Sequence, residues 1–321
     1  MKSNRRNFLT SAALISTGSL IPNIGFSLPT KKNNILNIDS NVTIGTITYS
    51  YRTLPSHLYS VIGYCLDSGI SNIELMAGNV ENFLGKPRSK SKSKEWIENI
   101  PLDGFKKVRD ILDTAGISVY AYKPSIISDL NATDKEIDMT LKAAKILGAN
   151  SVNLEIRDGV QYKIADVKKY DAHTKRLGDF GEKNNIYIGY HNHTQGKDDL
   201  WDKVLDQSEF NSINLDIGHY IARGRGNTKN TLLRFIRKNH SRITSMHVKD
   251  RQTPENGAYN KPFGQGDTPI LEIVNLIDKK EYNIPLSIEL EYVYSKRSNP
   301  VREVRKCVEY CKKGIEISKR I

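Results

Sequence analysis

The stretch IYIGYHNH (Ile186–His193), followed by NLDIGHY (Asn214–Tyr220) and SMHVKD (Ser245–Asp250), decides how this chain folds. Each run is short and β-like, and each ends in imidazole or carboxylate side chains. A fourth run, PLSIELEY (Pro285–Tyr292), ends in the same way with two glutamates. Four strands that deliver such side chains from the same end indicate one shared metal site.

Around this stretch, short β-like runs alternate with longer amphipathic segments. The β-like runs are Val42–Tyr51, Asn72–Met76, Ser118–Pro124, Ser151–Glu155, Ile186–Asn192, Ile213–Gly218, Ile243–Asp250 and Leu286–Tyr292. The helix-like segments are Pro55–Ser68, Leu102–Ala115, Thr133–Leu147, Tyr162–Lys183, Trp201–Leu205, Thr228–Asn239, Pro269–Lys280 and Pro300–Ser318. In several of these segments apolar residues recur at three- and four-residue spacing, which is typical of helices that cover a core.

Eight β–α units predict a (β/α)₈ TIM barrel in the α/β class. Residues 40–318 form it as a single domain, and barrels of this kind typically need about 250 residues. The alternative is an open doubly wound sheet, which carries a glycine-rich phosphate loop after its first strand. The segment Gly45–Pro55 is not such a loop. We therefore expect one barrel, with no linker inside it.

A barrel places its active site at the C-terminal ends of its strands. The expected strands end in ionisable residues, which are unusual inside apolar strands: Glu74, Lys123, Glu155, His191, Asp216, His247 and Glu289. Two imidazoles and two carboxylates from the last four strands suit Zn, Mn, Fe or Co. We predict that His191, Asp216, His247 and Glu289 bind one divalent ion.

The motifs NLDIGH, HVKD, GQGDTPI (Gly264–Ile270) and SIELE resemble the xylose-isomerase-like TIM-barrel superfamily across residues 40–318. That group includes sugar isomerases and epimerases, inosose dehydratases and endonuclease IV. The resemblance implies metal ligands at Asp216 of D-x-x-H, His247 of H-V-K-D and Glu289 on the last strand. The fourth family ligand is often the Glu of a Glu-Asn-His sequence, and His191 takes its place here.

This replacement bears on the reaction. Epimerases that resemble this chain use two carboxylates on opposite faces of the substrate, and His191 removes one of them. Another base is then needed, and the predicted catalytic residues are Glu155, Lys249 and His193. Burial beside a metal is expected to depress the pKa of Lys249 or His193 toward working pH.

Each of these residues also has a purely structural alternative. Lys249 can form a salt bridge with Asp250 or Glu291, and Glu155 can pair with Arg157 or Lys123. The residues predicted to bind substrate are His219, Glu291 and Lys123.

The predicted function is that of a divalent-metal-dependent sugar isomerase or epimerase acting through a metal-stabilised enediolate. A lyase that eliminates a β-substituent from a keto-sugar or keto-glycoside is the main alternative. A nuclease like endonuclease IV needs further histidines on its second and third strands, where this chain has Glu74 and Lys123. A sugar-binding barrel without catalysis is the remaining alternative. The expected partner is a small carbohydrate, and a homo-oligomer stays open.

The formal net charge is +12 and the mean hydropathy is -0.50, which is typical of a soluble globular protein. Lys and Arg are spread along the chain, so we expect no nucleic-acid partner. Their densest run, Lys86–Trp96, is expected to be one exposed loop. The three cysteines, two of them one helical turn apart, are expected to be packing residues without a disulfide framework.

Residues 1–30 have the layout of a twin-arginine-type signal peptide. The pair Arg5-Arg6 precedes Phe8-Leu9 and a short apolar run from Ala12 to Ile21. That run is too short to span a membrane. The sequence therefore predicts an exported, periplasmic protein without stable membrane insertion after signal cleavage.

Overall fold

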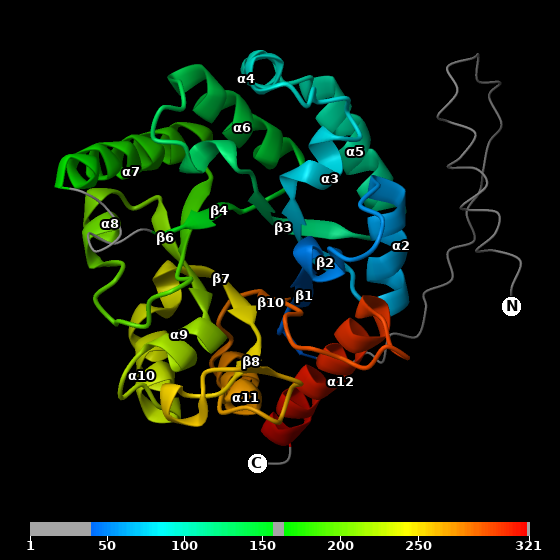
Figure 1. Ribbon diagram of the computed structural model, residues 1–321, viewed down its shortest axis with the longest axis vertical. Coiled ribbons are helices and arrows are strands. Elements are labelled where there is room, and N and C mark those ends of the chain that lie inside the picture. Colours follow the sequence, from blue (N-terminus) through cyan, green and yellow to red (C-terminus); the bar gives the residue numbers. More distant parts are fainter. Residues whose placement is uncertain (1–39, 157–163, 320–321) are drawn as a thin grey trace, which may run out of the picture. The chain divides into compact units, whose positions relative to one another are not determined.

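A computed structural model describes residues 40–156 and 164–319, and within them eight parallel strands close into a barrel (Figure 1). Around the barrel the strands follow the order β1-β10-β7-β6-β5-β4-β3-β2. Their bounds are β1 Ile44–Ile47, β2 Asn72–Met76, β3 Ser118–Lys123, β4 Ser151–Glu155, β5 Tyr187–His191, β6 Asn211–Asp216, β7 Ile243–Val248 and β10 Leu286–Ile288. The pairing of Ile44 with Leu286 joins the first strand to the last. The predicted (β/α)₈ barrel is confirmed.

Helices surround the barrel on the outside (Figure 1). They are α2 Leu58–Ser68, α3 Ala77–Glu81, α4 Lys90–Glu98, α5 Leu102–Thr114, α6 Asp134–Ile146, α7 Ile164–Asn184, α8 Asp202–Gln207, α9 Ile217–Arg223, α10 Lys229–Asn239, α11 Ile270–Lys280 and α12 Pro300–Ser318. Local sequence explains where several begin. Thr133 and Glu136 form a capping box at α6, and Asn299 caps α12 ahead of Pro300.

The inside of the barrel holds a buried polar layer below the mouth. Asn214 on β6 and Asn153 on β4 both donate to the hydroxyl of Ser245 on β7, over 2.8 and 3.3 Å. All three side chains are buried. Because buried polar groups are stable only when they are hydrogen-bonded, this layer is a fixed floor for the side chains above it.

The structure corrects several expected boundaries. The run Lys86–Trp96 was expected to be an exposed loop. Its residues from Lys90 onward instead belong to helix α4, which packs on α6. Ile97 is its one buried residue, and Glu98 accepts a hydrogen bond from Thr133. Packing therefore forms a helix where the sequence shows little apolar periodicity. The first and last strands are shorter than expected, because β1 turns into a 3₁₀ helix at Thr48–Tyr51 and β10 ends at Ile288.

A two-stranded ribbon, β8 Asp250–Arg251 with β9 Asn260–Lys261, follows β7 outside the barrel. The Asp250 carboxylate accepts hydrogen bonds from the backbone N–H groups of Gly264, Gln265 and Gly266, over 2.7, 3.1 and 3.0 Å. Its other oxygen accepts from the Thr268 amide over 3.2 Å. A Cβ at Gly266 would lie 2.2 Å from this carboxylate, so the loop needs glycine there.

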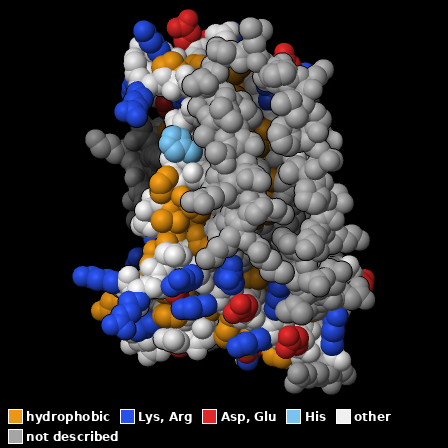
Figure 2. All heavy atoms as spheres, turned by 90° about the vertical axis from the view of Figure 1, so that its right-hand side faces the viewer, with side chains coloured by type: hydrophobic (Ala, Val, Ile, Leu, Met, Phe, Trp, Pro, Cys, Tyr) orange, Lys and Arg blue, Asp and Glu red, His pale blue; other side chains and the backbone are white. Residues whose placement is uncertain are grey.

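Cys65, Cys307 and Cys311 are free and buried, as expected for packing residues. None of the described helices combines the length and the apolar character that crossing a bilayer requires. On the face drawn in Figure 2, acidic side chains lie among the Lys and Arg side chains instead of leaving one continuous basic surface.

Candidate metal centre

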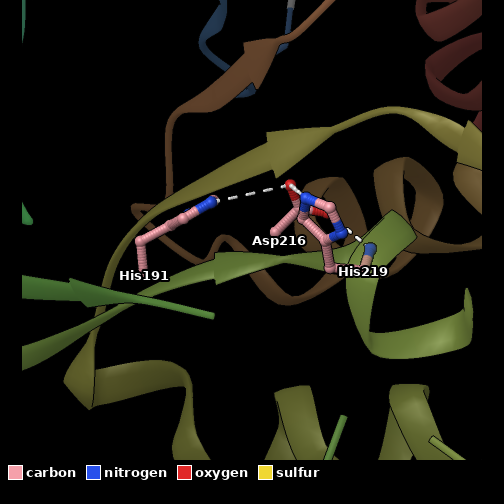
Figure 3. Close-up of side chains that lie close together, drawn as sticks. All are labelled: His191, Asp216 and His219. Carbon is pink, nitrogen blue, oxygen red and sulfur yellow. Dashed lines mark hydrogen bonds and ion pairs between the residues drawn. The ribbon is translucent and has the colours of Figure 1, made fainter. Parts of the chain in front are cut away.

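Imidazole and carboxylate groups converge where β5, β6, β7 and β10 end. Two sets of three potential ligands share Asp216, and within each set the ligand atoms lie within 4.8 Å of one another: His191, Asp216 and His219, and Asp216, His247 and Glu289. Figure 3 shows His191 and His219 on two sides of Asp216. Their Nε2 atoms lie 3.9 and 3.7 Å from Asp216 Oδ2. The four residues predicted as ligands are thus brought together.

Asp216 lies at the centre of the cluster and is fixed through its other atoms. Its backbone N–H donates to Asn192 Oδ1, and its Oδ1 caps α9 by accepting from the His219 amide, over 2.8 and 2.7 Å. Its Oδ2 is buried and has no hydrogen-bond partner among the described residues. A buried carboxylate oxygen needs a positive partner, which here is the Lys249 ammonium at 2.9 Å and in a loaded site would be a metal ion.

His191 is held as a neutral imidazole. Its Nδ1 faces Asn214 Oδ1 at 2.9 Å, which leaves Nε2 directed toward Asp216. Burial, and then the positive charge of Lys123, hold the pKa of His191 well below its ordinary value. An imidazole that donates one N–H to a neighbour and presents its other nitrogen is typical of metal sites.

His247 lies between two carboxylates. Its Nε2 lies 2.8 Å from Glu74 Oε2, and its Nδ1 lies 3.0 Å from Glu289 Oε2. Burial alone would lower the pKa of His247, but Glu74 and Glu289 raise it to about 9. Glu74 reaches this position from β2, and it was not among the residues predicted to form the site. Its one signal was a carboxylate inside an otherwise apolar strand.

Lys249 inserts its ammonium group among the carboxylates of the site. Its Nζ lies 2.6 Å from Glu289 Oε2 and 2.7 Å from Glu291 Oε2. It also lies 2.9 Å from Asp216 Oδ2, as an ion pair without hydrogen-bond geometry. Burial would lower the pKa of Lys249, but these three carboxylates outweigh burial and raise it. Among these protein groups the pKa of Lys249 is raised, not depressed, and the expected salt bridge with Glu291 is present.

His219 and His193 lie above Asp216, toward the mouth. His219 Nδ1 faces the Arg251 guanidinium at 2.7 Å, and its Nε2 lies 3.3 Å from Lys249 Nζ. Burial and these two cations lower its pKa. His193 is exposed, and its ring centre lies 4.7 Å from that of His219. Both residues, predicted to contact substrate or move protons, therefore face the same space.

Glu155 and Lys123 lie where β4 and β3 end, on the two strands that follow β5 around the mouth. Glu155 is in register with His191 on the neighbouring strand, yet it is exposed. Both residues line a cavity of about 610 Å³ beside the ligand cluster. Their expected ion pair is not formed, and Arg157 lies outside the described residues.

The sequence matches the family described as "Xylose isomerase-like TIM barrel" over residues 62–313, and the chain belongs to that family. No curated protein matches the chain in sequence.

Three solved structures illustrate the similarity of fold. One is "IOLI protein with a binding zinc atom", at 14% identity and a TM-score of 0.63, covering 86% of this chain and 99% of that one. Another is 3-keto-D-glucoside 4-epimerase, YcjR, from E. coli, at 12% identity and a TM-score of 0.60, covering 85% of this chain and 99% of that one. The third is the probable 3-DHS dehydratase AsbF from Bacillus anthracis, at 11% identity and a TM-score of 0.60, covering 83% of this chain and 99% of that one. At these identities the likeness establishes the fold.

Proposed function

We propose that this chain is a divalent-metal-dependent enzyme that removes a proton beside the carbonyl of a sugar or keto-sugar, as an isomerase or epimerase. The observation that carries the proposal is the convergence of His191, Asp216, His247 and Glu289 around a buried carboxylate oxygen without a hydrogen-bond partner. Relatives of the same fold, described as an epimerase, a dehydratase and a zinc-binding protein, support this class of chemistry.

The donor set fits a metal of the Mn, Fe, Co or Zn group. An ion held by these four residues would act as a Lewis acid on adjacent carbonyl and hydroxyl oxygens of the sugar. Glu74 fits the role of the carboxylate that orients His247, because histidine ligands usually donate their second N–H to such a group.

The carboxylates of Asp216, Glu289 and Glu291 raise the pKa of Lys249, which makes Lys249 a weaker candidate for the base than its neighbours. Glu155 and His193 remain the candidates for the base, and both are exposed toward the mouth. Imidazole and carboxylate are common general bases in enzymes. Lys249 is suited to donate a hydrogen bond to a substrate oxygen, together with the adjacent Glu291.

Elimination is the second candidate reaction, and His191 is the observation that favours it. Reprotonation of the enediolate on its opposite face needs a second acid–base group. His191 is buried, bound to Asn214 and held neutral, so it does not replace the carboxylate that family epimerases carry at this position. Expulsion of a substituent from the β-carbon requires no acid–base group at position 191: one of Glu155 and His193 would remove the proton, and the other would protonate the leaving group.

Metal analysis combined with isotope exchange tests the proposal. Purified protein should contain close to one divalent ion per chain. With a panel of keto-sugars and keto-glycosides in D₂O, it should either incorporate solvent deuterium or release a β-substituent. Absence of bound metal, together with neither exchange nor release after loading with Mn, Co or Zn, would refute the proposal.

A further inference from the structure

The cavity of about 610 Å³ beside the metal centre is built by the ends of β2, β3 and β4. Met76, Lys123 and Glu155 are the last residues of these strands, and all three line it. Glu155 is in register with the candidate ligand His191. Neighbouring strands lie about 4.8 Å apart, so the cavity begins one strand away from the ligands. Cavities of about 300–1,000 Å³ hold ligands of drug size, so there is room for a substituent beyond the reacting atoms.

Charge is unbalanced in this cavity. Three cations line it, and one of them, Lys86, is neutralised by the buried Glu81 carboxylate at 2.6 Å. Arg88 and Lys123 form no hydrogen bond or ion pair with any described residue, although the charge of Lys123 also lowers the pKa of the buried Glu74. The remaining carboxylate in the lining is that of Glu155. Unpaired cations in a concave wall focus a positive potential and attract anions.

Hydrogen-bond donors accompany these cations. Ser93 at the start of α4, and Ser125 and Ser128 after β3, line the same cavity. A guanidinium group binds a carboxylate in a two-pronged geometry, and hydroxyl groups can satisfy its remaining lone pairs. The lining therefore offers the groups that a bound anion needs.

We propose that this cavity is a subsite for an anionic group of the substrate, contacted by Arg88 and Lys123. The proposal rests on the function proposed above, because it takes the reacting sugar to lie over the metal centre. The enzyme then acts on an acidic sugar, or on a sugar that carries an acidic substituent. Arg88 distinguishes such substrates from neutral ones.

Calorimetric binding of two matched pairs of probes tests the subsite. Glucuronate and glucose place the charge on the ring, whereas p-carboxyphenyl and phenyl β-D-glucosides place it on the substituent. In at least one pair, the wild type should bind the acid about tenfold more tightly than its neutral partner. Arg88→Gln should bring the acid to the affinity of the neutral probe, whose own binding is unchanged. Lys92→Gln, an exposed α4 residue outside the lining, is the charge-matched control and should keep the preference.

Equal affinities in both pairs, no binding of any probe, or a preference that survives Arg88→Gln would overturn the subsite. Binding at equilibrium does not depend on turnover. Failure of metal loading or of deuterium exchange would therefore count against the proposed function, while the Arg88-dependent preference would still be measured. The pair that shows the preference tells whether the anion lies on the ring or on the substituent.

Discussion

At the scale of single residues, the candidate ligands converge at the mouth of the barrel, and groups from distant strands hold them in place. His191, Asp216, His247 and Glu289 end strands, and a barrel brings strand ends together. Glu74 contacts His247 across the barrel, over a sequence separation of 173 residues, which no local pattern reveals. The pKa of Lys249 was misjudged because three carboxylates meet at its ammonium group.

The first prediction concerns Asp216, which both candidate ligand sets share. Asp216→Asn removes the charge and replaces one oxygen by an amide, so bound metal and turnover should each fall by at least about 100-fold. Elemental analysis and the deuterium-exchange assay measure these losses. Asp103→Asn, an exposed aspartate on α5, is the matched control and should change neither quantity. Full metal content in Asp216→Asn would show that the site is misplaced.

The second prediction concerns the pH dependence of the metal-free protein. Glu74 and Glu289 raise the pKa of the buried His247 to about 9, whereas an ordinary imidazole titrates near about 6.5. The stabilisation is therefore fully present below pH ~6.5 and is lost as the pH rises through ~9. The melting temperature measured with chelator should fall across this window.

Glu74→Gln keeps a hydrogen-bond acceptor for His247 but removes one negative charge. The fall of melting temperature between pH ~6.5 and ~9 should become shallower in this variant, because the pKa of His247 returns toward its ordinary value. Glu182→Gln, an exposed glutamate on α7, should retain the wild-type slope. Identical slopes in Glu74→Gln and the wild type would contradict the assigned charge on His247.

At the scale of elements, the order of strands and helices was predictable, whereas some ends and short helices were not. The strand Asn72–Met76 and the helix Pro300–Ser318 have their expected bounds. Helix α4 was missed because its Lys- and Ser-rich sequence buries only Ile97 and depends on contact with α6. Helices α3 and α9 have only five and seven residues and follow strands at the mouth, where helix propensity is a weak guide.

The third prediction belongs to the loop that Asp250 holds. In the wild type, backbone N–H groups donate to the Asp250 carboxylate. Asp250→Asn replaces the carboxylate with a neutral amide, so the free energy of unfolding should fall by about 2–3 kcal/mol. Chemical denaturation measures this loss, and protease cleavage within residues 252–266 should become faster. Metal content should stay unchanged, because Asp250 is not a ligand. Asp206→Asn, at an exposed position on α8, is the control. Equal stability of the two variants would refute the claim that Asp250 stabilises this loop.

At the scale of the whole molecule, the barrel unit Ser40–Ile321 is one compact domain. The expected signal peptide, residues 1–30, lies outside the described residues, and the periplasmic location remains a prediction. The proposed metal site and the predicted export are chemically linked. Protein affinity for divalent ions rises from Mn toward Cu, so the metal acquired depends on where the protein folds.

The fourth prediction is that export follows folding and metal loading. Replacement of Arg5 and Arg6 by Lys should leave the protein folded, metal-loaded and retained in the cytoplasm, since the arginine pair addresses the twin-arginine route. Cell fractionation and metal analysis of each fraction check this outcome. Unchanged export of the variant would indicate the ordinary secretion route and would separate the choice of metal from export.

The ammonium group of Lys249 has a consequence for how such a site changes over evolutionary time. Three carboxylates confined at the mouth would repel one another in the absence of a metal, but this chain supplies its own counter-charge. Because Lys249 balances these carboxylates, we expect the fold to tolerate loss of the ion, so that a substitution that weakens metal binding is judged by activity alone. When the fold tolerates loss of the ion, ligands can be exchanged one at a time. The imidazole of His191, at a position where the family resemblance leads one to expect a glutamate, is an exchange of this kind.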